Sequence, residues 1–136
     1  MSDEESYELL GFDNVLLPVG DLNEAVAFYE RAGFAVGFRL DEAGIALLKV
    51  GAETPGILLR VEEGLRCRPP HWPSPRIWLE VPDARAAARR LAAVGIAPLD
   101  EVLQGATGWT VELADPWGNL LGLTDYTKRP ALARRI

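Results

Sequence analysis

Residues 76–96 read RIWLEVPDARAAARRLAAVGI and carry the signals of one strand followed by one helix. Over residues 76–81 apolar side chains alternate with other side chains, and this two-residue period predicts a half-buried strand. Asp83 can cap the helix that follows, because its carboxylate accepts hydrogen bonds from the free N–H groups of a first helical turn. Gly95 stands where helices commonly end in a left-handed residue. The apolar stripe of the expected helix consists of Ala84, Ala87, Ala88, Leu91 and Val94.

The same signals occur 62 residues earlier in the chain. A strand-like segment at 14–19 is followed by an aspartate, a helical pattern and a glycine in the same order. Four pairs of residues share the offset of 62: Asp21 and Asp83, Gly33 and Gly95, Gly56 and Gly118, and Leu59 and Leu121. Two unrelated strand–helix units of similar composition would not be expected to keep these landmarks in one register. The spacing therefore predicts an internal duplication.

Apolar periodicity and turn residues predict the order βαβββ in each half of the chain. In the first half we expect strands at 14–19, 34–40, 45–50 and 57–62 and a helix at 22–32. In the second half we expect strands at 76–81, 99–103, 109–114 and 120–124 and a helix at 84–94. Because Pro18 lacks an N–H group, we expect the first strand to lie at a sheet edge. The predicted fold class is therefore α+β, with two tandem βαβββ modules.

The two modules are expected to form one domain over residues 1–136, with module one near 12–63 and module two near 76–126. The segment 64–75 contains four prolines, which exclude a helix and predict an extended linker. The acidic residues before residue 10 are expected to form a mobile tail. The basic segment 127–136 is expected to be a solvated C-terminus.

Composition excludes several classes of function. The chain has 136 residues, a formal net charge of −6 and 49% apolar residues, as expected of one globular domain. The negative charge argues against nucleic acid as a partner, because phosphate binding requires a basic face. No segment is long and apolar enough to suggest a membrane span, and the acidic start does not resemble a signal peptide. A single cysteine, Cys67, allows no internal disulfide and fits a cytoplasmic protein.

Two motifs are similar to a known family. The segment NVLLPVGDL at 14–22, followed by A-x-x-F-Y at 25–29, resembles the usual first strand and helix of the vicinal oxygen chelate superfamily. The segment ELADPWGNLLGL at 112–123 resembles its usual end. This superfamily contains glyoxalases, bleomycin resistance proteins and extradiol dioxygenases. The resemblance covers roughly residues 12–125 and implies curved mixed sheets that pair, within one chain or across a dimer, around a central cavity.

The resemblance also implies a possible metal site. Enzymes of the superfamily hold a divalent metal through a His at the start of each module's first strand and a Glu in the last strand. The corresponding positions here are Asn14, Arg76, Gly122 and, by the offset of 62, Arg60. Arginine has donors but no acceptor and stays charged, whereas divalent metals prefer carboxylate, imidazole or carbonyl ligands. We therefore expect neither a metal nor another cofactor. A shift of register could still bring Glu62 or Glu80 into a ligating position.

Strand parity predicts which side chains face the cavity. If the apolar residues of 76–81 face the helix, their neighbours face the opposite side. The predicted ligand-binding residues are Asn14, Leu16, Arg60, Arg76, Trp78, Glu80, Thr110, Glu112 and Gly122, and the predicted rim or interface residues are Trp72, Trp109 and Trp117. The alternatives are that Trp78 only fills space between the sheets and that the charged residues form an ion-pair network. Cys67 and His71 lie in the proline-rich linker, which does not favour a catalytic pair.

Three functions compete at this point. The first is a metal-free protein of the bleomycin-resistance type, which sequesters a small-molecule ligand between modules as a homodimer and has no catalytic residue. The second is a lyase, isomerase or dioxygenase. Such an enzyme would need a metal held by Glu80 or Glu112 with Asn14, or acid–base catalysis by one of these carboxylates. The third is a protein-interaction module whose tryptophans serve only oligomerisation.

Overall fold

The computed structural model describes residues 6–69 and 75–134, and the predicted residues Trp72 and His71 lie outside these ranges. Module one contains β1 (Val15–Val19), α1 (Leu22–Arg31), β2 (Ala35–Leu40), the short helix η2 (Asp41–Ala43), β3 (Ile45–Val50) and β4 (Glu53–Val61). Module two contains β5 (Ile77–Glu80), α2 (Ala84–Ala93), β6 (Leu103–Gln104), β7 (Trp109–Ala114) and β8 (Leu120–Thr124), and the short helix η3 (Pro130–Leu132) follows. The α+β fold with two βαβββ modules is confirmed.

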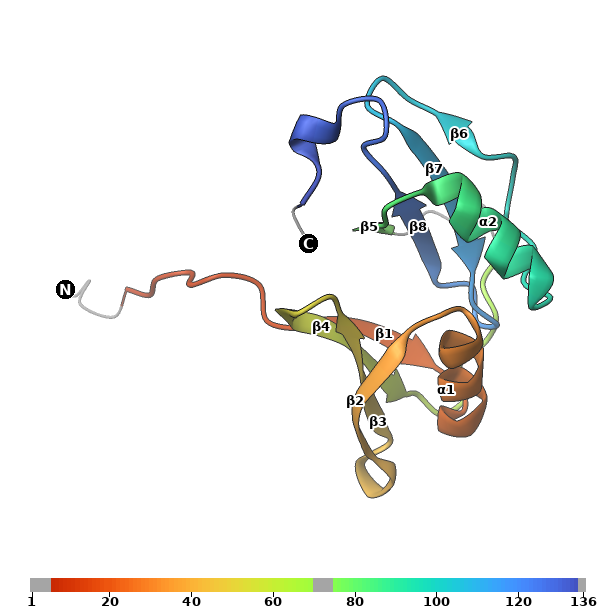
Figure 1. Ribbon diagram of the computed structural model, residues 1–136. Helices are drawn as coiled ribbons and strands as arrows, with labels where there is room; N and C mark the ends of the chain where they lie inside the picture. Colours follow the sequence, from red (N-terminus) through yellow and green to blue (C-terminus); the bar gives the residue numbers. More distant parts are fainter. Residues whose placement is uncertain (1–5, 70–74, 135–136) are drawn as a thin grey trace.

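Both modules have the same sheet topology. The strand order is β1-β4-β3-β2 in the first sheet and β5-β8-β7-β6 in the second. In each sheet the first strand pairs in parallel with the last, and the other pairs are antiparallel, so both sheets are mixed. The strand that contains Pro18 lies at an edge, as its missing N–H group predicted. Figure 1 shows the modules as two halves of the chain, with the segment before β1 extending away from both.

Helix capping follows the sequence signals. The carboxylate of Asp21 accepts a hydrogen bond from the Glu24 N–H at 2.8 Å, and that of Asp83 accepts from two N–H groups in the first turn of α2. Gly33 and Gly95 follow the two helices with positive φ angles of 106° and 82°. Both helices are ten residues long, and no helix in the described ranges is long and apolar enough to cross a membrane.

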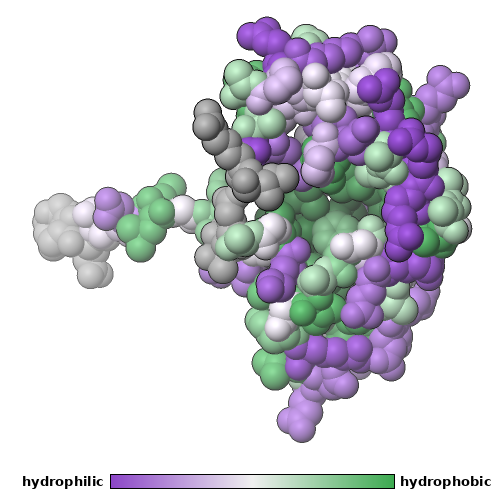
Figure 2. Space-filling model, viewed as in Figure 1, coloured by the Kyte–Doolittle hydropathy of each residue, from purple (hydrophilic) through white to green (hydrophobic). Residues whose placement is uncertain are grey.

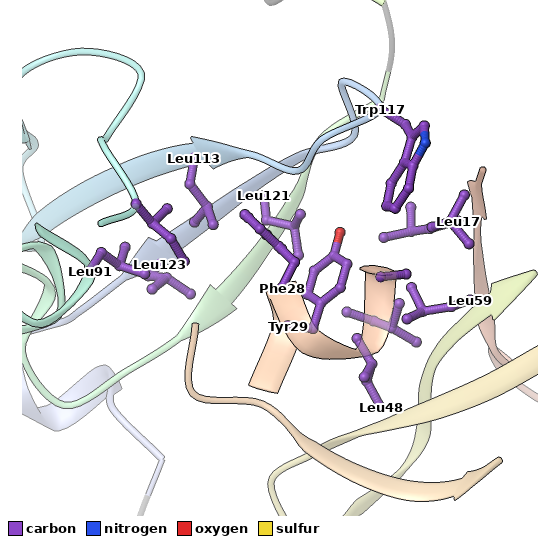
Figure 3. Close-up of a cluster of buried hydrophobic side chains, with 14 of the residues drawn as sticks. Leu17, Phe28, Tyr29, Leu48, Leu59, Leu91, Leu113, Trp117, Leu121 and Leu123 are labelled. Atoms are coloured by element: carbon purple, nitrogen blue, oxygen red, sulfur yellow. The ribbon is translucent and has the colours of Figure 1, made fainter. Parts of the chain in front are cut away.

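One hydrophobic core joins the two modules. Figure 3 shows α1 contributing Phe28 and Tyr29 to a cluster that also receives side chains from module two. The buried leucines of this cluster come from both sheets and from α2: Leu17, Leu48, Leu59, Leu91, Leu113, Leu121 and Leu123. The modules therefore share their buried apolar surface.

The junction between the modules is the turn at 115–119. Tyr29 Oη donates a hydrogen bond of 2.7 Å to Asp115 Oδ2, and Asn119 Nδ2 donates one of 2.8 Å to the carbonyl of Pro18. The indole of Trp117 packs against Gly20, where a Cβ atom would collide with it. This turn of module two therefore docks on α1 and on the end of β1.

The structure corrects the register of the expected repeat. Val15 pairs with Ile57 and Ile77 pairs with Leu121, so the first strands are 62 residues apart but the last strands are 64 apart. The expected match of Leu59 with Leu121 is therefore wrong, because Leu59 occupies the position of Leu123. The difference arises after the helices, where the connections of module two are longer.

Three further expectations are corrected. The strand expected at 99–103 is reduced to β6 (Leu103–Gln104), although the Leu99 N–H still donates to the Glu112 carbonyl. The last strand of module one begins at Glu53, four residues earlier than expected. The C-terminal segment is not simply solvated, because Arg134 donates to Glu80 through its backbone N–H and its guanidinium group.

Asp125 is the polar centre of module two. It is 1% exposed, and its carboxylate accepts hydrogen bonds from the backbone N–H groups of Ala84, Trp109 and Thr127 and from the Thr127 hydroxyl. Burial raises the pKa of this carboxyl group, but the backbone hydrogen bonds outweigh burial and lower the pKa to about 2. The ionised carboxylate thus links the start of α2 to β7 and to the segment after β8.

We expect Asp125→Asn to lower the free energy of unfolding at neutral pH by about 2 kcal/mol, because an amide nitrogen cannot accept the hydrogen bonds of the carboxylate. The folded-state pKa lies below the unfolded value, so the contribution of Asp125 is present above about pH 4 and is lost as the pH falls toward about 2. The variant should therefore lose less stability on acidification, as measured by urea titration at each pH. Asp100→Asn, at an exposed carboxylate, is the control. Identical acid dependence of the natural chain and the Asp125 variant would contradict this expectation.

Candidate functional site

The sheet face of module two that points away from α2 carries a tryptophan between charged groups. Trp78, Gly122 and Glu112 are cross-strand neighbours in register. The Trp78 indole lies over Gly122, and its Nε1 donates a hydrogen bond of 2.9 Å to Glu112 Oε2. Arg76 Nη1 lies 3.6 Å from Glu112 Oε1. Both carboxylate oxygens of Glu112 are therefore engaged, while the indole remains 53% exposed.

The corresponding face of module one is more aliphatic. Leu16 pairs with Leu58, which pairs with Leu47, and Phe38 completes this row on β2. The next row contains Arg60, whose guanidinium donates to Glu62 at 2.7 Å. We call these two faces, one per module, the outer faces. Aliphatic and aromatic side chains line both outer faces. The arginines beside them, Arg60 and Arg76, already have Glu62 and Glu112 as carboxylate partners.

Both outer faces are open in the single chain. Their exposed large apolar residues are Leu16, Phe38, Leu40, Trp78 and Leu103, which are 43% to 53% exposed. Apolar surface of this kind, carried on two regular sheets, is typical of a site that a ligand or a partner covers. In the single chain the outer faces are therefore two uncovered surfaces, and the central cavity stays a prediction.

The remaining predicted ligand-binding residues have local partners. Asn14 Oδ1 accepts a hydrogen bond from the Gly56 N–H at 3.2 Å, at the start of β1. Thr110 is buried, and its hydroxyl lies 2.7 Å from that of Thr124. Hydrogen bonds from the Arg134 backbone and guanidinium hold the pKa of Glu80 below its ordinary value. The structure brings Arg76, Trp78, Glu112 and Gly122 together on one face, and it places Asn14, Leu16 and Arg60 on or beside the other.

The predicted rim or interface tryptophans have different surroundings. The Trp109 ring contacts two cations, with the Arg85 guanidinium carbon 4.4 Å and Lys128 Nζ 5.0 Å from its centroid. Trp117 is buried at the junction of the modules. Trp72 and His71 lie outside the described residues, so the pair of Cys67 with His71 is not tested; Cys67 itself is exposed.

The residues present do not fit the divalent metal that the resemblance implies for the enzymes. By sheet register the position of Gly122 in module one is Leu58, not Arg60. The implied ligand positions are therefore an amide, an arginine, a leucine and a glycine covered by an indole, and only the amide offers a suitable oxygen. In the described part of the chain, no three His, Cys, Asp or Glu side chains gather as a possible metal group.

Two adjoining hollows lie elsewhere, between the modules. The first, of about 460 Å³, lies between the end of β3 and α2, and the second, of about 890 Å³, extends it toward the C-terminal segment. They share Gly51, Glu80 and Val81, and we call them together the inter-module groove. Figure 2 shows a hollow with a mainly hydrophobic floor and hydrophilic residues along its rim. Of the predicted ligand-binding residues only Glu80 lines it.

Strand parity alone misses several residues of the outer faces. A β-bulge lies between Val36 and Phe38, so these two residues of equal parity point to opposite faces. Val36 pairs with buried Leu48, whereas Phe38 pairs with Leu47. The glycine at position 37 is the sequence signal that could have indicated this bulge.

Comparisons with known proteins agree with the two sequence motifs. The model of the Glyoxalase/Bleomycin resistance protein/Dioxygenase superfamily matches residues 11–123, which confirms the resemblance. A comparison with curated proteins gave no match. A solved bleomycin-binding protein complexed with bleomycin is 28% identical, with a TM-score of 0.65, over 85% of this chain and 98% of that chain. A bleomycin resistance determinant encoded on transposon Tn5 is 26% identical, with a TM-score of 0.67, over 86% of this chain and 98% of that chain. FosX, a fosfomycin resistance protein from Listeria monocytogenes, shares the fold at 16% identity and a TM-score of 0.69. The match covers 88% of this chain and 96% of that chain.

Gly122→Ala should displace the Trp78 indole. A Cβ atom at residue 122 would lie 2.5 Å from Trp78 Cδ1, and overpacking of this kind costs about 1–3 kcal/mol. We expect a lower free energy of unfolding and a changed NMR resonance of the Trp78 indole N–H, since its hydrogen bond to Glu112 is lost. The matched control is Gly105→Ala, whose Cβ would meet its nearest atom at 3.6 Å. An unchanged indole resonance in Gly122→Ala would contradict the placement of Trp78.

Proposed function

The chain belongs to the Glyoxalase/Bleomycin resistance protein/Dioxygenase superfamily, and from this membership we propose that it is a metal-free protein that sequesters a small-molecule ligand against its outer faces. The observation that carries the proposal is the Trp78 indole over Gly122. The place of the implied ligating glutamate is filled by an aromatic ring, which offers stacking surface instead of a metal ligand. The bleomycin-binding relative, at 28% identity, supports ligand binding as the function.

In this proposal a second copy of the chain covers the outer faces and so closes the ligand-binding cavity. Each outer face is open in one chain, and the face of module one is mainly aliphatic whereas that of module two carries the indole. A homodimer that apposes unlike faces would enclose two equivalent pockets, because a twofold axis repeats every contact. The exposed thiol of Cys67 is compatible with such a protein in the reducing cytoplasm.

The side chains of the outer faces favour a ligand with a planar group and little net charge. The Trp78 indole offers a flat surface, whereas Arg76 and Arg60 already have Glu112 and Glu62 as partners. Acid–base catalysis by Glu112 would require breaking its contacts with Trp78 and Arg76. These contacts support binding over the alternative of a lyase, isomerase or dioxygenase.

We expect isothermal titration with metal-free bleomycin to give saturable binding, and Trp78→Ala to weaken it by about tenfold or more through loss of the stacking surface. Leu132→Ala is the control, because Leu132 is an equally exposed apolar residue outside the outer faces. Equal affinities of the natural chain and Trp78→Ala would contradict the proposed site. If neither bleomycin nor a panel of planar molecules changed thermal stability, the protein-interaction function would be favoured.

Metal content provides a second, independent test of the same proposal. Protein purified without chelator should contain no stoichiometric transition metal, because the implied positions lack a ligand set. The proposal would be overturned if the protein contained stoichiometric Zn, Ni, Mn or Fe and if a chelator removed both this metal and an enzymatic turnover.

A further inference from the structure

The inter-module groove has apolar walls from both modules and the size of a ligand site. Its two hollows, of about 460 Å³ and 890 Å³, lie in the range that small-molecule sites occupy. Leu79 and Leu123 belong to the side of the second sheet that packs on the common core, opposite to Trp78. The second sheet therefore separates the groove from the outer face of module two. The large apolar residues that line the first hollow are Phe34, Val50, Leu79, Val81, Leu91 and Leu123.

The charged residues around the groove have a positive balance. Lys49, Arg90 and Arg134 line the two hollows, whereas Glu80 is the one carboxylate residue among the described residues that line them. Glu80 Oε1 lies 2.7 Å from Arg134 Nη1, so its charge is compensated. On a chain with a net charge of −6 this local balance is unexpected, and it attracts an anionic ligand.

Arg90 is the cation best placed to bind such an anion. It lies on α2 between the lining residues Ala87 and Leu91, and no carboxylate in the described part of the chain forms an ion pair with it. Lys49 also lacks such a partner, but its Cγ lies 3.2 Å from where a Cβ atom at Gly37 would be, so its stem runs along β2. A guanidinium group can donate two parallel hydrogen bonds to one carboxylate.

We propose that the inter-module groove is a second ligand site, which takes a monocarboxylate with an apolar chain. Arg90 binds the carboxylate, and the apolar walls cover the chain. A neutral apolar ligand would leave the positive charge of the groove unused, and a cationic ligand would be repelled by it. This site does not rest on the proposed function of the outer faces, because its walls lie on the other side of the second sheet.

The test is isothermal titration of the full chain with decanoate, at concentrations below micelle formation. We expect saturable binding that is about tenfold or more tighter than that of octanoate, because decanoate buries two more methylene groups. Binding of 1-decanol should be at least about tenfold weaker than that of decanoate, because it has the same chain without the charge. Arg90→Glu should weaken decanoate binding by at least about tenfold. Arg89→Glu is the matched control, because Arg89 neighbours Arg90 on α2 but does not line the groove.

Three results would overturn the groove site. These are the absence of saturable decanoate binding, equal affinities for decanoate and 1-decanol, and equal affinities of the natural chain and Arg90→Glu for decanoate. If decanoate did not bind and Arg90→Glu changed the oligomeric state, the groove would be a protein interface instead of a ligand site.

Crossed titrations separate this inference from the proposed function. Trp78→Ala should weaken bleomycin binding and leave decanoate binding unchanged, whereas Arg90→Glu should do the reverse. If Trp78→Ala weakened decanoate binding as strongly as Arg90→Glu, both ligands would share the outer faces and the second site would be overturned. If bleomycin did not bind while decanoate bound through Arg90, the groove site would stand and the proposed function would fail.

Discussion

A hydrogen bond of 2.7 Å from Tyr29 Oη to Asp115 Oδ2 connects α1 of module one to the turn between β7 and β8 of module two. Both residues are buried, and burial together with the neighbouring carboxylate raises the pKa of the Tyr29 hydroxyl, which therefore stays protonated and donates. Asp115 also accepts from the N–H groups of Trp117 and Asn119, so its charge is compensated within the turn. Because a buried carboxylate without these partners would be costly, the turn and the helix must meet in this one arrangement.

The same junction determines which surfaces remain available. The helix-covered faces of both sheets are used for the common core, so the outer faces are left to solvent. The linker strengthens this arrangement, because the Arg68 N–H donates to the Trp117 carbonyl and a side chain at Gly118 would collide with the Arg68 backbone. The open outer faces and the inter-module groove are therefore two consequences of one orientation of the modules.

Local signals in the sequence were sufficient for most of the fold and for part of the site. Asp21 and Asp83 could be identified as helix caps because capping depends on residues within one turn, and the parity of β5 correctly grouped Arg76 with Trp78. A constant repeat offset could not reveal that the last strands are 64 residues apart, since loop insertions leave no periodic signal. The contact of Arg134 with Glu80 joins residues 54 positions apart and depends on tertiary structure alone. For the same reason the groove could not be predicted from strand patterns.

The cross-strand pair of Trp78 and Gly122 shows how this fold can exchange one chemistry for another with few changes. Cross-strand neighbours lie within about 5 Å, so the volume at position 122 decides what position 78 can hold. A glutamate at 122 would need the space of the indole, and the indole can lie flat only over a residue without a Cβ atom. Stacking and metal ligation at this place therefore exclude each other sterically, whatever the rest of the cavity contains.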